Sequence, residues 1–316
     1  MTQPISERVK LGGTDIAISP IGIGTWAWGD RFVWSYGKTH TDADIRAAFD
    51  AALTTGINLF DTAEVYGLGR SERLLGQFIR ETGKSVVVAT KFMPFPIWLT
   101  KNALRRALRN SLKRLGMARV DLYQMHVPFP PVPVETWMDA MADAVESGLV
   151  RAVGVSNYDQ AQMGRAHNAL MKHGIPLASN QVFYSLLHRE PEFNGVAQLC
   201  KDLNVTLIAY SPLEKGILTG KYTPDNPPPG MRQRLYTREY LKKVQPLLET
   251  LREFGAAHGG KTEAQVALNW TICKGAVPIP GAKNTRQAVS NAGALGWRLT
   301  DDEVTILDEL SLAVTK

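Results

Sequence analysis

The sequence has few cysteines and no long apolar run. Only two of its 316 residues are cysteine, Cys200 and Cys273, which excludes a disulfide framework and fits a reducing compartment. No stretch reaches the roughly 18 consecutive apolar residues of a transmembrane helix. The polar N-terminus, MTQPISERVK, also lacks the apolar centre of a secretion signal. We therefore expect a soluble, cytoplasmic protein without a membrane partner.

Basic residues outnumber acidic ones, with 36 Lys and Arg against 30 Asp and Glu and a net charge of +6. Such a surplus raises nucleic acid or an anionic membrane as partners. However, the sequence has no basic patch interleaved with aromatic residues and no zinc-ligand spacing, so we expect neither a nucleic-acid partner nor a metal site. We interpret the charge mainly as solvated surface that also favours an anionic cofactor.

The strongest local concentration of basic charge is at residues 101–116, where Arg105, Arg106, Arg109, Lys113 and Arg114 accompany a stripe of four leucines. This pattern is typical of a helix that lies on a membrane surface. It is equally the pattern of an outer barrel helix, which buries one apolar stripe and keeps a charged face in water. We favour the barrel helix because it is much the commoner origin of this pattern.

Short apolar runs alternate with amphipathic stretches along the chain, without a linker-like change in composition. This is the pattern of a parallel α/β barrel. The runs number eight, as a closed (β/α)8 or TIM barrel requires; they are residues 21–24, 57–60, 86–90, 120–125, 152–155, 178–180, 206–209 and 276–279. We expect a single domain over residues 1–316.

The helical stretches between these runs are expected at residues 42–55, 71–81, 102–115, 134–147, 160–172, 192–202, 238–257 and 285–294, with a final helix at 302–310. Apolar segments around Gly12 and Gly13 predict an N-terminal β-hairpin over residues 8–18 that closes the barrel floor. A long proline-containing segment follows the seventh strand. Such a segment is either a lid over the barrel mouth or an ordered surface loop.

Four polar residues follow three of the expected strands: Asp61, Tyr66, Lys91 and His126. Because the carboxyl ends of barrel strands meet at one mouth, these side chains are expected to share a pocket. A phenol donates protons at neutral pH, and a nearby ammonium group is expected to lower its pKa. Asp61 would keep the lysine charged, while a neutral imidazole would orient the acceptor oxygen. The set suits proton donation to a carbonyl oxygen.

A rival motif occurs at residues 22–27, where Gly-Ile-Gly-Thr-Trp-Ala matches the GxGxxA fingerprint of a dinucleotide-binding Rossmann unit. That motif requires a helix to begin within the glycine turn, so that its N-terminus meets the pyrophosphate. Here an aromatic, loop-like segment follows the turn. We therefore reject the Rossmann interpretation.

Four segments, in order, resemble the aldo-keto reductase family: Asn58-Leu-Phe-Asp-Thr-Ala-Glu-Val-Tyr-Gly67, Ala89-Thr-Lys91, Asp121-Leu-Tyr-Gln-Met-His126 and Val153-Gly-Val-Ser-Asn157. The resemblance spans residues 8–295. It implies a (β/α)8 barrel and reversible reduction of aldehydes or ketones by a nicotinamide cofactor, usually NADPH. In that reaction hydride reaches the carbonyl carbon while Tyr66 protonates the oxygen.

The same resemblance implies which residues bind NADP(H). Ser156, Asn157 and Gln181 would hydrogen-bond the nicotinamide carboxamide, Tyr210 would stack on its ring, and Lys283 would meet the 2′-phosphate. The other implied contacts are Gly24, Thr25, Trp26, Asp61, Ser211, Pro212, Leu213, Gly216, Ile279, Gly281, Ala282, Gln287 and Asn291. The sequence departs from the family at Ser290, where relatives often have glutamate.

Some family members shape the substrate pocket with a long C-terminal loop, but this chain ends soon after its last helix. We therefore expect other loops, which are rich in aromatic residues, to select the substrate. Trp28, Phe92 and Phe129 are expected to line the pocket together with Tyr66 and His126. Further rings occur nearby, at Phe32, Trp34, Tyr36, Phe95 and Trp98. An apolar wall of this kind favours aromatic or flat aldehydes over sugars.

Two classes of function fit the sequence. The first is an NADPH-dependent reductase of small carbonyl compounds. The second is a regulatory subunit that senses redox state through bound NADPH, because the family includes potassium-channel accessory subunits. The short N-terminal extension favours the enzyme. The sequence leaves the physiological substrate open, and both a pyridoxal-type aldehyde and general aldehyde detoxification fit it. The reaction direction and the oligomeric state are open as well.

Overall fold

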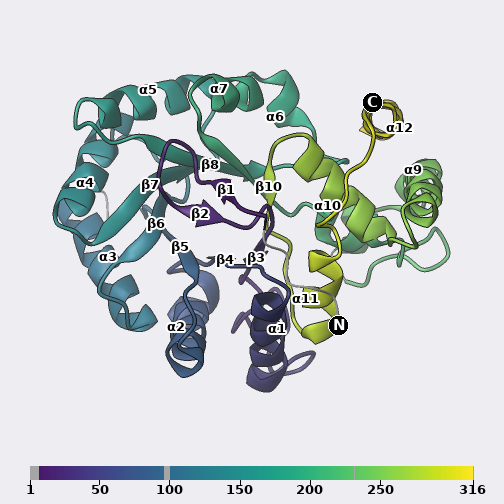
Figure 1. Cartoon of the computed structure of the whole chain (residues 1–316), viewed down its shortest axis with the longest axis horizontal. Helices are drawn as coiled ribbons and strands as arrows, with labels where there is room; N and C mark the ends of the chain where they lie inside the picture. Colours follow the sequence, from purple (N-terminus) through teal and green to yellow (C-terminus); the bar gives the residue numbers. More distant parts are fainter. Residues whose placement is uncertain (1–6, 96–99, 231, 316) are drawn as a thin grey trace.

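Eight parallel strands form the centre of the molecule (Figure 1). The computed structural model describes residues 7–95, 100–230 and 232–315. The barrel strands are β3 (Gly22–Gly24), β4 (Leu59–Asp61), β5 (Val87–Phe92), β6 (Val120–Met125), β7 (Val150–Ser156), β8 (Leu177–Phe183), β9 (Thr206–Tyr210) and β10 (Val277–Pro278). Each pairs with its neighbour in chain order. A parallel bridge between Gly24 and Gly281 joins the two edges, which confirms the predicted barrel.

Helices surround the barrel on its outer side (Figure 1). They are α1 (Asp42–Thr54), α2 (Arg70–Thr82), α3 (Lys101–Leu115), α4 (Val134–Glu146), α5 (Gln160–Met171), α6 (Glu190–Phe193), α7 (Val196–Asp202), α8 (Arg232–Leu235), α9 (Arg238–Ala257), α10 (Glu263–Cys273), α11 (Thr285–Ala292) and α12 (Asp301–Thr315), with 3-10 turns η1 (Tyr66–Gly69) and η2 (Glu214–Thr219). Side-chain oxygens accept the first free backbone N–H groups of several helices, at Thr41, Thr100, Asp159, Thr237, Thr262 and Asn284. These caps fix where the helices begin.

One helix prediction was wrong in detail, and one helix was missed. Residues 192–202 do not form one helix, because Gly195 adopts a left-handed conformation (φ +82°) that separates α6 from α7. Helix α10 was not predicted from the sequence. Seven consecutive residues of α10, Val266 to Ile272, are all buried, so the helix has no clear polar face to produce an amphipathic period.

The basic helix α3 is an outer helix of the barrel. Its leucine stripe, Leu104, Leu108, Leu112 and Leu115, is buried in the main apolar core, while most of its basic side chains lie on the other face. The membrane-surface interpretation of this segment was therefore wrong, because its apolar stripe is already covered by protein. Among the described residues, no helix combines the length and apolarity needed to cross a bilayer.

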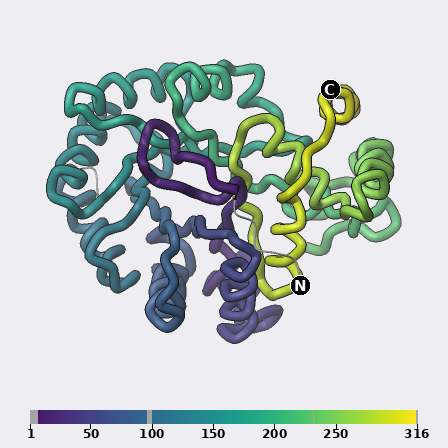
Figure 2. The backbone as a smooth tube through the Cα atoms, viewed as in Figure 1, coloured from purple at the N-terminus to yellow at the C-terminus, as the bar shows by residue number. Residues whose placement is uncertain are grey.

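The N-terminal hairpin closes the amino-terminal end of the barrel. Strands β1 (Val9–Lys10) and β2 (Ala17–Ile18) are antiparallel, and Figure 2 shows this loop lying across the barrel end. Leu11, Ile16 and Ile18 join inward-facing strand residues in a second apolar cluster. At Gly12 (φ +54°) an added Cβ would lie 2.5 Å from a backbone oxygen, so only glycine fits. The predicted hairpin and its role in closing the floor are confirmed.

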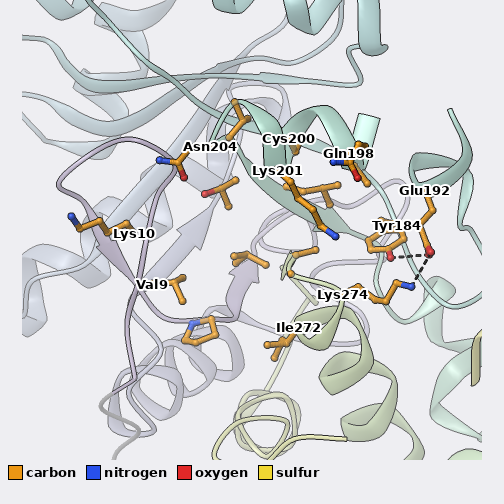
Figure 3. A pocket seen from close by; sticks show the side chains of 18 of the residues that line it. Val9, Lys10, Tyr184, Glu192, Gln198, Cys200, Lys201, Asn204, Ile272 and Lys274 are labelled. Carbon is orange, nitrogen blue, oxygen red and sulfur yellow. Dashed lines mark hydrogen bonds and ion pairs between the residues drawn. The ribbon is translucent and has the colours of Figure 1, made fainter. Parts of the chain in front are cut away.

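A cavity of about 550 Å³ lies at the same, amino-terminal end, between α7 and α10 (Figure 3). It is lined by Thr206 at the start of β9 and by Ala276 and Val277 beside β10. On its wall, Lys274 pairs with Glu192 (3.0 Å) and with Asp308 (2.8 Å). Since the four expected catalytic residues follow the opposite ends of their strands, this cavity is distinct from the barrel mouth.

Candidate active site

A buried ion pair lies at the centre of the barrel mouth. Lys91, near the end of β5, is fully buried, and its Nζ lies 2.5 Å from Oδ1 of Asp61 at the end of β4. Nζ also donates to the backbone oxygen of Thr62 at 2.9 Å. Burial, the largest single cause, lowers the pKa of Lys91, but the charges of Asp61 and Tyr66 and the hydrogen bonds to them together outweigh it, and the net pKa is raised. The lysine is therefore a charged ammonium group at neutral pH.

The second oxygen of Asp61 is held by two glutamines. Nε2 of Gln181 donates to Oδ2 at 2.8 Å, and Nε2 of Gln124 donates to the same atom at 3.2 Å. Gln124 therefore faces the barrel interior, which the sequence analysis did not recognise. Gln124 lies on β6, two residues before His126. Because alternate residues of a strand share a face, this spacing could have predicted that Gln124 points inward. Asp61 is oriented by three hydrogen-bonded partners.

The phenol of Tyr66 lies beside this pair. Its ring centroid is 5.1 Å from Nζ of Lys91, and the ring is partly buried. Burial raises the pKa of Tyr66, and the positive charge of Lys91 offsets only part of that rise. The expected net lowering of this pKa was therefore wrong, although Lys91 acts in the expected direction. The phenol stays protonated at neutral pH and can donate its proton.

His126 meets Tyr66 edge to face, with ring centroids 5.9 Å apart at 83°. Burial, followed by the charge of Lys91, lowers the pKa of His126 to about 3. The imidazole is therefore neutral, as expected from the sequence. Its buried Nδ1 has no hydrogen-bond partner among the described residues. No hydrogen bond among the described residues therefore fixes this nitrogen of the ring.

Three residues expected to hold the nicotinamide carboxamide or ring are joined to this site. The hydroxyl of Tyr210 donates to Oδ1 of Asn157 at 3.0 Å, and Nδ2 of Asn157 donates to the backbone oxygen of His126 at 3.1 Å. The Ser156 hydroxyl donates to the backbone oxygen of Gln181 at 2.8 Å. The structure therefore brings these residues together around Asp61, Tyr66, Lys91 and His126, the catalytic tetrad expected from the sequence. The amide of Gln181 points to Asp61.

Lys283 lies in a group of unpaired cations. Burial lowers its pKa, and so does the positive charge of Arg232 and Lys221. Among the described residues, none of the three forms an ion pair with a carboxylate. Such a group of positive charges suits an anion such as a nucleotide phosphate. Lys221 and Arg232 were missed in the sequence; both lie in the long segment after the seventh strand, which was noted only as a loop.

The other expected cofactor residues lie along the same rim, after the ends of β3, β9 and β10. Several have roles within the protein: Thr25 Oγ1 donates to the backbone oxygen of Asp61 at 3.0 Å, Gln287 accepts from the N–H of Lys283 at 2.8 Å, and Asn291 donates to the oxygen of Gly281 at 3.3 Å. The rest of this group is Gly24, Ser211, Pro212, Leu213, Gly216, Ile279 and Ala282.

Two residues expected in the substrate pocket lie elsewhere. Trp28 is fully buried between the barrel and its helices, where it packs on Phe60 and Phe78. Phe92 is also fully buried and packs on Trp137 of α4. Both assignments are corrected. For Phe92 the reason is strand alternation: because Lys91 points into the barrel, the next side chain must point outward.

Trp26, which was expected among the cofactor contacts, lies at the mouth where Trp28 had been expected. Its ring is 40% exposed and stacks on Tyr66. Phe129, after His126, is half-buried, and Phe32 is 92% exposed. Trp98 lies outside the described residues. The exposed aromatic surface at the mouth is therefore built from Trp26 rather than from Trp28.

Comparison with known proteins agrees with this geometry. The model of the Aldo/keto reductase family matches residues 20–312. The chain belongs to the aldo/keto reductase family. It is thus an oxidoreductase by family, in keeping with the resemblance seen in its sequence.

Individual relatives cover almost the whole chain. It is 46% identical to a chloroplastic pyridoxal reductase of Arabidopsis thaliana, over 94% of this chain and 84% of that protein. It is 32% identical to the aldo-keto reductase yakc [NADP(+)] of Schizosaccharomyces pombe, over 87% and 84%. A solved thermostable aldo-keto reductase in complex with the inhibitor epalrestat superposes with a TM-score of 0.78 at 31% identity, over 96% and 99%.

Proposed function

We propose that the protein is an NADPH-dependent reductase of aldehydes, with Tyr66 as general acid. The observation that carries this proposal is the arrangement of Tyr66 next to the buried Lys91–Asp61 pair and the neutral His126. A protonated phenol, a fixed positive charge and an uncharged hydrogen-bonding ring are the groups needed to protonate a carbonyl oxygen.

Each residue has a separate task in the proton transfer. Tyr66 donates its proton to the carbonyl oxygen and becomes a phenolate. Lys91 stabilises that phenolate electrostatically, because the ammonium group is held close to the ring and away from water. Asp61 keeps Lys91 charged and in place. His126 directs the carbonyl oxygen toward the phenol through a hydrogen bond from its ring.

The cofactor preference rests on the cations near Lys283. When bound, NADPH supplies the hydride that adds to the carbonyl carbon. Lys283, Arg232 and Lys221 would hold its phosphates, since they have no carboxylate partner among the described residues. The name of the yeast relative, which specifies NADP(+), supports the same choice. Ser156, Asn157 and Gln181 would hold the carboxamide, and Tyr210 would contact the nicotinamide ring.

Aromatic aldehydes are the substrate class that the mouth favours. Trp26 offers an exposed, flat surface directly beside Tyr66, on which a planar ring can stack. Pyridoxal is a planar aromatic aldehyde, and the 46% identical plant relative is named a pyridoxal reductase. We therefore propose pyridoxal or an aldehyde of similar shape as the substrate.

NADPH oxidation by the purified protein, followed at 340 nm, tests this function. The panel contains pyridoxal, 4-nitrobenzaldehyde, a short aliphatic aldehyde and glucose. We expect the two aromatic aldehydes to be reduced fastest and glucose slowest. Binding of NADPH without turnover of any aldehyde would contradict the proposal and favour a redox-sensing subunit instead.

A further inference from the structure

Glu64 connects the loop that carries Tyr66 to the strand that carries Lys91. Its Oε1 accepts a hydrogen bond from the backbone N–H of Met93 at 2.8 Å, and its own N–H points to the backbone oxygen of Lys91 at 3.4 Å. Asp61 and Tyr66 lie three residues before it and two after it. The side chain thus binds β4 and β5 together just beyond their ends, where the catalytic groups emerge.

Among the residues that the structure describes, the carboxyl group has no cation of its own. The groups that face it are Glu72 from α2, Arg114 from α3 and Tyr123 from β6. Arg114 is already paired with Glu72 at 2.5 Å, and the Tyr123 hydroxyl is buried without a partner among the described residues. Burial raises the pKa of Glu64 to about 7; the Met93 N–H lowers it, Glu72 raises it and Arg114 lowers it.

Such a placement is unfavourable for stability. A partly buried carboxyl group without a counter-ion costs free energy when it ionises, and an apolar or amide side chain would not carry this cost. The compensating feature is the bond to Met93, which no apolar residue could make. The position of Glu64 therefore points to a role in geometry.

Within the described part of the chain, the turn directly after Tyr66 makes no hydrogen bond to β5. Gly67 and Leu68 both have φ of +55°, so the chain turns sharply through a left-handed conformation directly after the phenol. An added Cβ at Gly67 would lie 2.7 Å from the backbone oxygen of Gly29. Leu68 is mostly exposed, whereas the residues before Tyr66 are attached to the end of β5 through Glu64.

We propose that Glu64 is a positioning residue, which ties the Tyr66 loop to the end of β5 and so fixes the phenol relative to the ammonium group of Lys91. This inference rests on the proposed general-acid role of Tyr66. It predicts that loss of the Glu64 bond slows turnover without weakening the binding of NADPH, whose expected contacts, apart from Asp61, lie on other loops.

Two variants separate positioning from simple stability. Glu64→Ala removes the acceptor for the Met93 N–H, while Glu64→Gln keeps an oxygen in the same place without charge. We expect Glu64→Ala to lower kcat by at least about 10-fold, as for a misplaced catalytic group. The Kd for NADPH, measured by fluorescence, should change less than about twofold, and Glu64→Gln should recover most of the wild-type kcat.

Asp121→Ala is the matched control. Asp121 accepts a hydrogen bond from the backbone N–H of Val88 at 2.9 Å, the same kind of bond at the opposite end of β5. We expect this variant to lower the melting temperature but to leave kcat almost unchanged. An equal loss of kcat in Asp121→Ala, full activity of Glu64→Ala, or failure of Glu64→Gln to recover activity would each overturn the proposal.

A measurement independent of turnover distinguishes failure of this inference from failure of the proposed function. Ultraviolet difference titration, with Tyr66→Phe as the reference, follows the ionisation of Tyr66 itself. We expect its apparent pKa to move by at least about half a unit in Glu64→Ala, because the distance to Lys91 changes, and to stay in place in Glu64→Gln. An unchanged value in Glu64→Ala would overturn the positioning role even if the wild type reduces no aldehyde.

Discussion

The rings of Trp26 and Tyr66 lie stacked, with centroids 5.9 Å apart and planes at 24°. Trp26 is 40% exposed, so one side of this pair is open to a molecule at the barrel mouth. A substrate ring that packs on Trp26 would bring its carbonyl group beside the phenol. The same residue would then choose the substrate and orient it.

Replacing Trp26 by alanine should therefore affect aromatic substrates most. We expect Trp26→Ala to raise KM for pyridoxal or 4-nitrobenzaldehyde by about 10-fold, the effect of losing roughly 1.4 kcal/mol of ring contact. The KM for a short aliphatic aldehyde should change little. Steady-state kinetics with both substrates measures the difference, and equal losses for the two would contradict selection by Trp26.

Lys283 should determine the preference between the two nicotinamide cofactors. It faces Arg232 and Lys221 without a carboxylate partner, and the 2′-phosphate is the group that only NADPH carries. We expect Lys283→Ala to weaken NADPH binding by at least about 10-fold, as for one lost charged hydrogen bond, and to leave NADH binding nearly unchanged. Fluorescence titration with both cofactors tests this. Lys201→Ala, in the cavity at the opposite end, is the control and should alter neither Kd.

Asp61 should be needed for both stability and turnover. Its carboxylate lies 2.5 Å from a fully buried ammonium group, and breaking such a pair leaves an uncompensated buried charge. We expect Asp61→Asn to lower the free energy of unfolding by about 3 kcal/mol and to lower kcat strongly. Denaturant titration and kinetics measure the two effects.

The pH dependence of the Asp61 effect has a definite sign. The pKa of Lys91 is raised in the folded protein, so its contribution to stability is fully present at neutral pH and is lost as the pH rises through the folded value. The wild type should therefore lose more stability than Asp61→Asn above about pH 10.5, the ordinary lysine value. A constant difference from pH 7 to pH 11 would contradict this account of the pair.

Glu64 should make the stability of the wild type fall as the pH rises. The pKa of its carboxyl group is about 7 in the folded protein, against 4.5 for an ordinary glutamate. Between these values the folded state binds more protons than the unfolded state, so ionisation destabilises the fold. Glu64→Gln, which cannot ionise, should become more stable relative to the wild type between pH 5 and pH 8. Melting temperatures of the variant and the wild type at pH 5 and at pH 8 test this prediction.

The barrel could be predicted because its strands and helices produce local sequence patterns. The meeting of Asp61, Tyr66, Lys91 and His126 at one mouth could then be predicted from their positions after the strand ends. Residues 120–125 were predicted as a strand with its observed limits, since the run is wholly buried and ends at His126. Helix α10 could not be predicted in the same way, because a helix buried on nearly all sides has no polar face to reveal its period.

The side-chain environment was harder to predict than the fold. Trp28 and Phe92 were expected at the mouth because they follow strands, yet both rings point into the layer between barrel and helices. The pKa of Tyr66 depends on burial as well as on Lys91, and burial is a property of the folded chain. The bond from Met93 to Glu64 joins residues 29 positions apart, which no local pattern shows.

The central claim is that the phenol of Tyr66 gives a proton to a carbonyl oxygen. Tyr66→Phe removes the hydroxyl and keeps the ring that stacks on Trp26. The decisive measurement is single-turnover oxidation of bound NADPH by pyridoxal or 4-nitrobenzaldehyde in this variant and in the wild type. We predict a rate at least about 100-fold lower in Tyr66→Phe, with an unchanged Kd for NADPH, whereas a rate equal to that of the wild type would contradict the account.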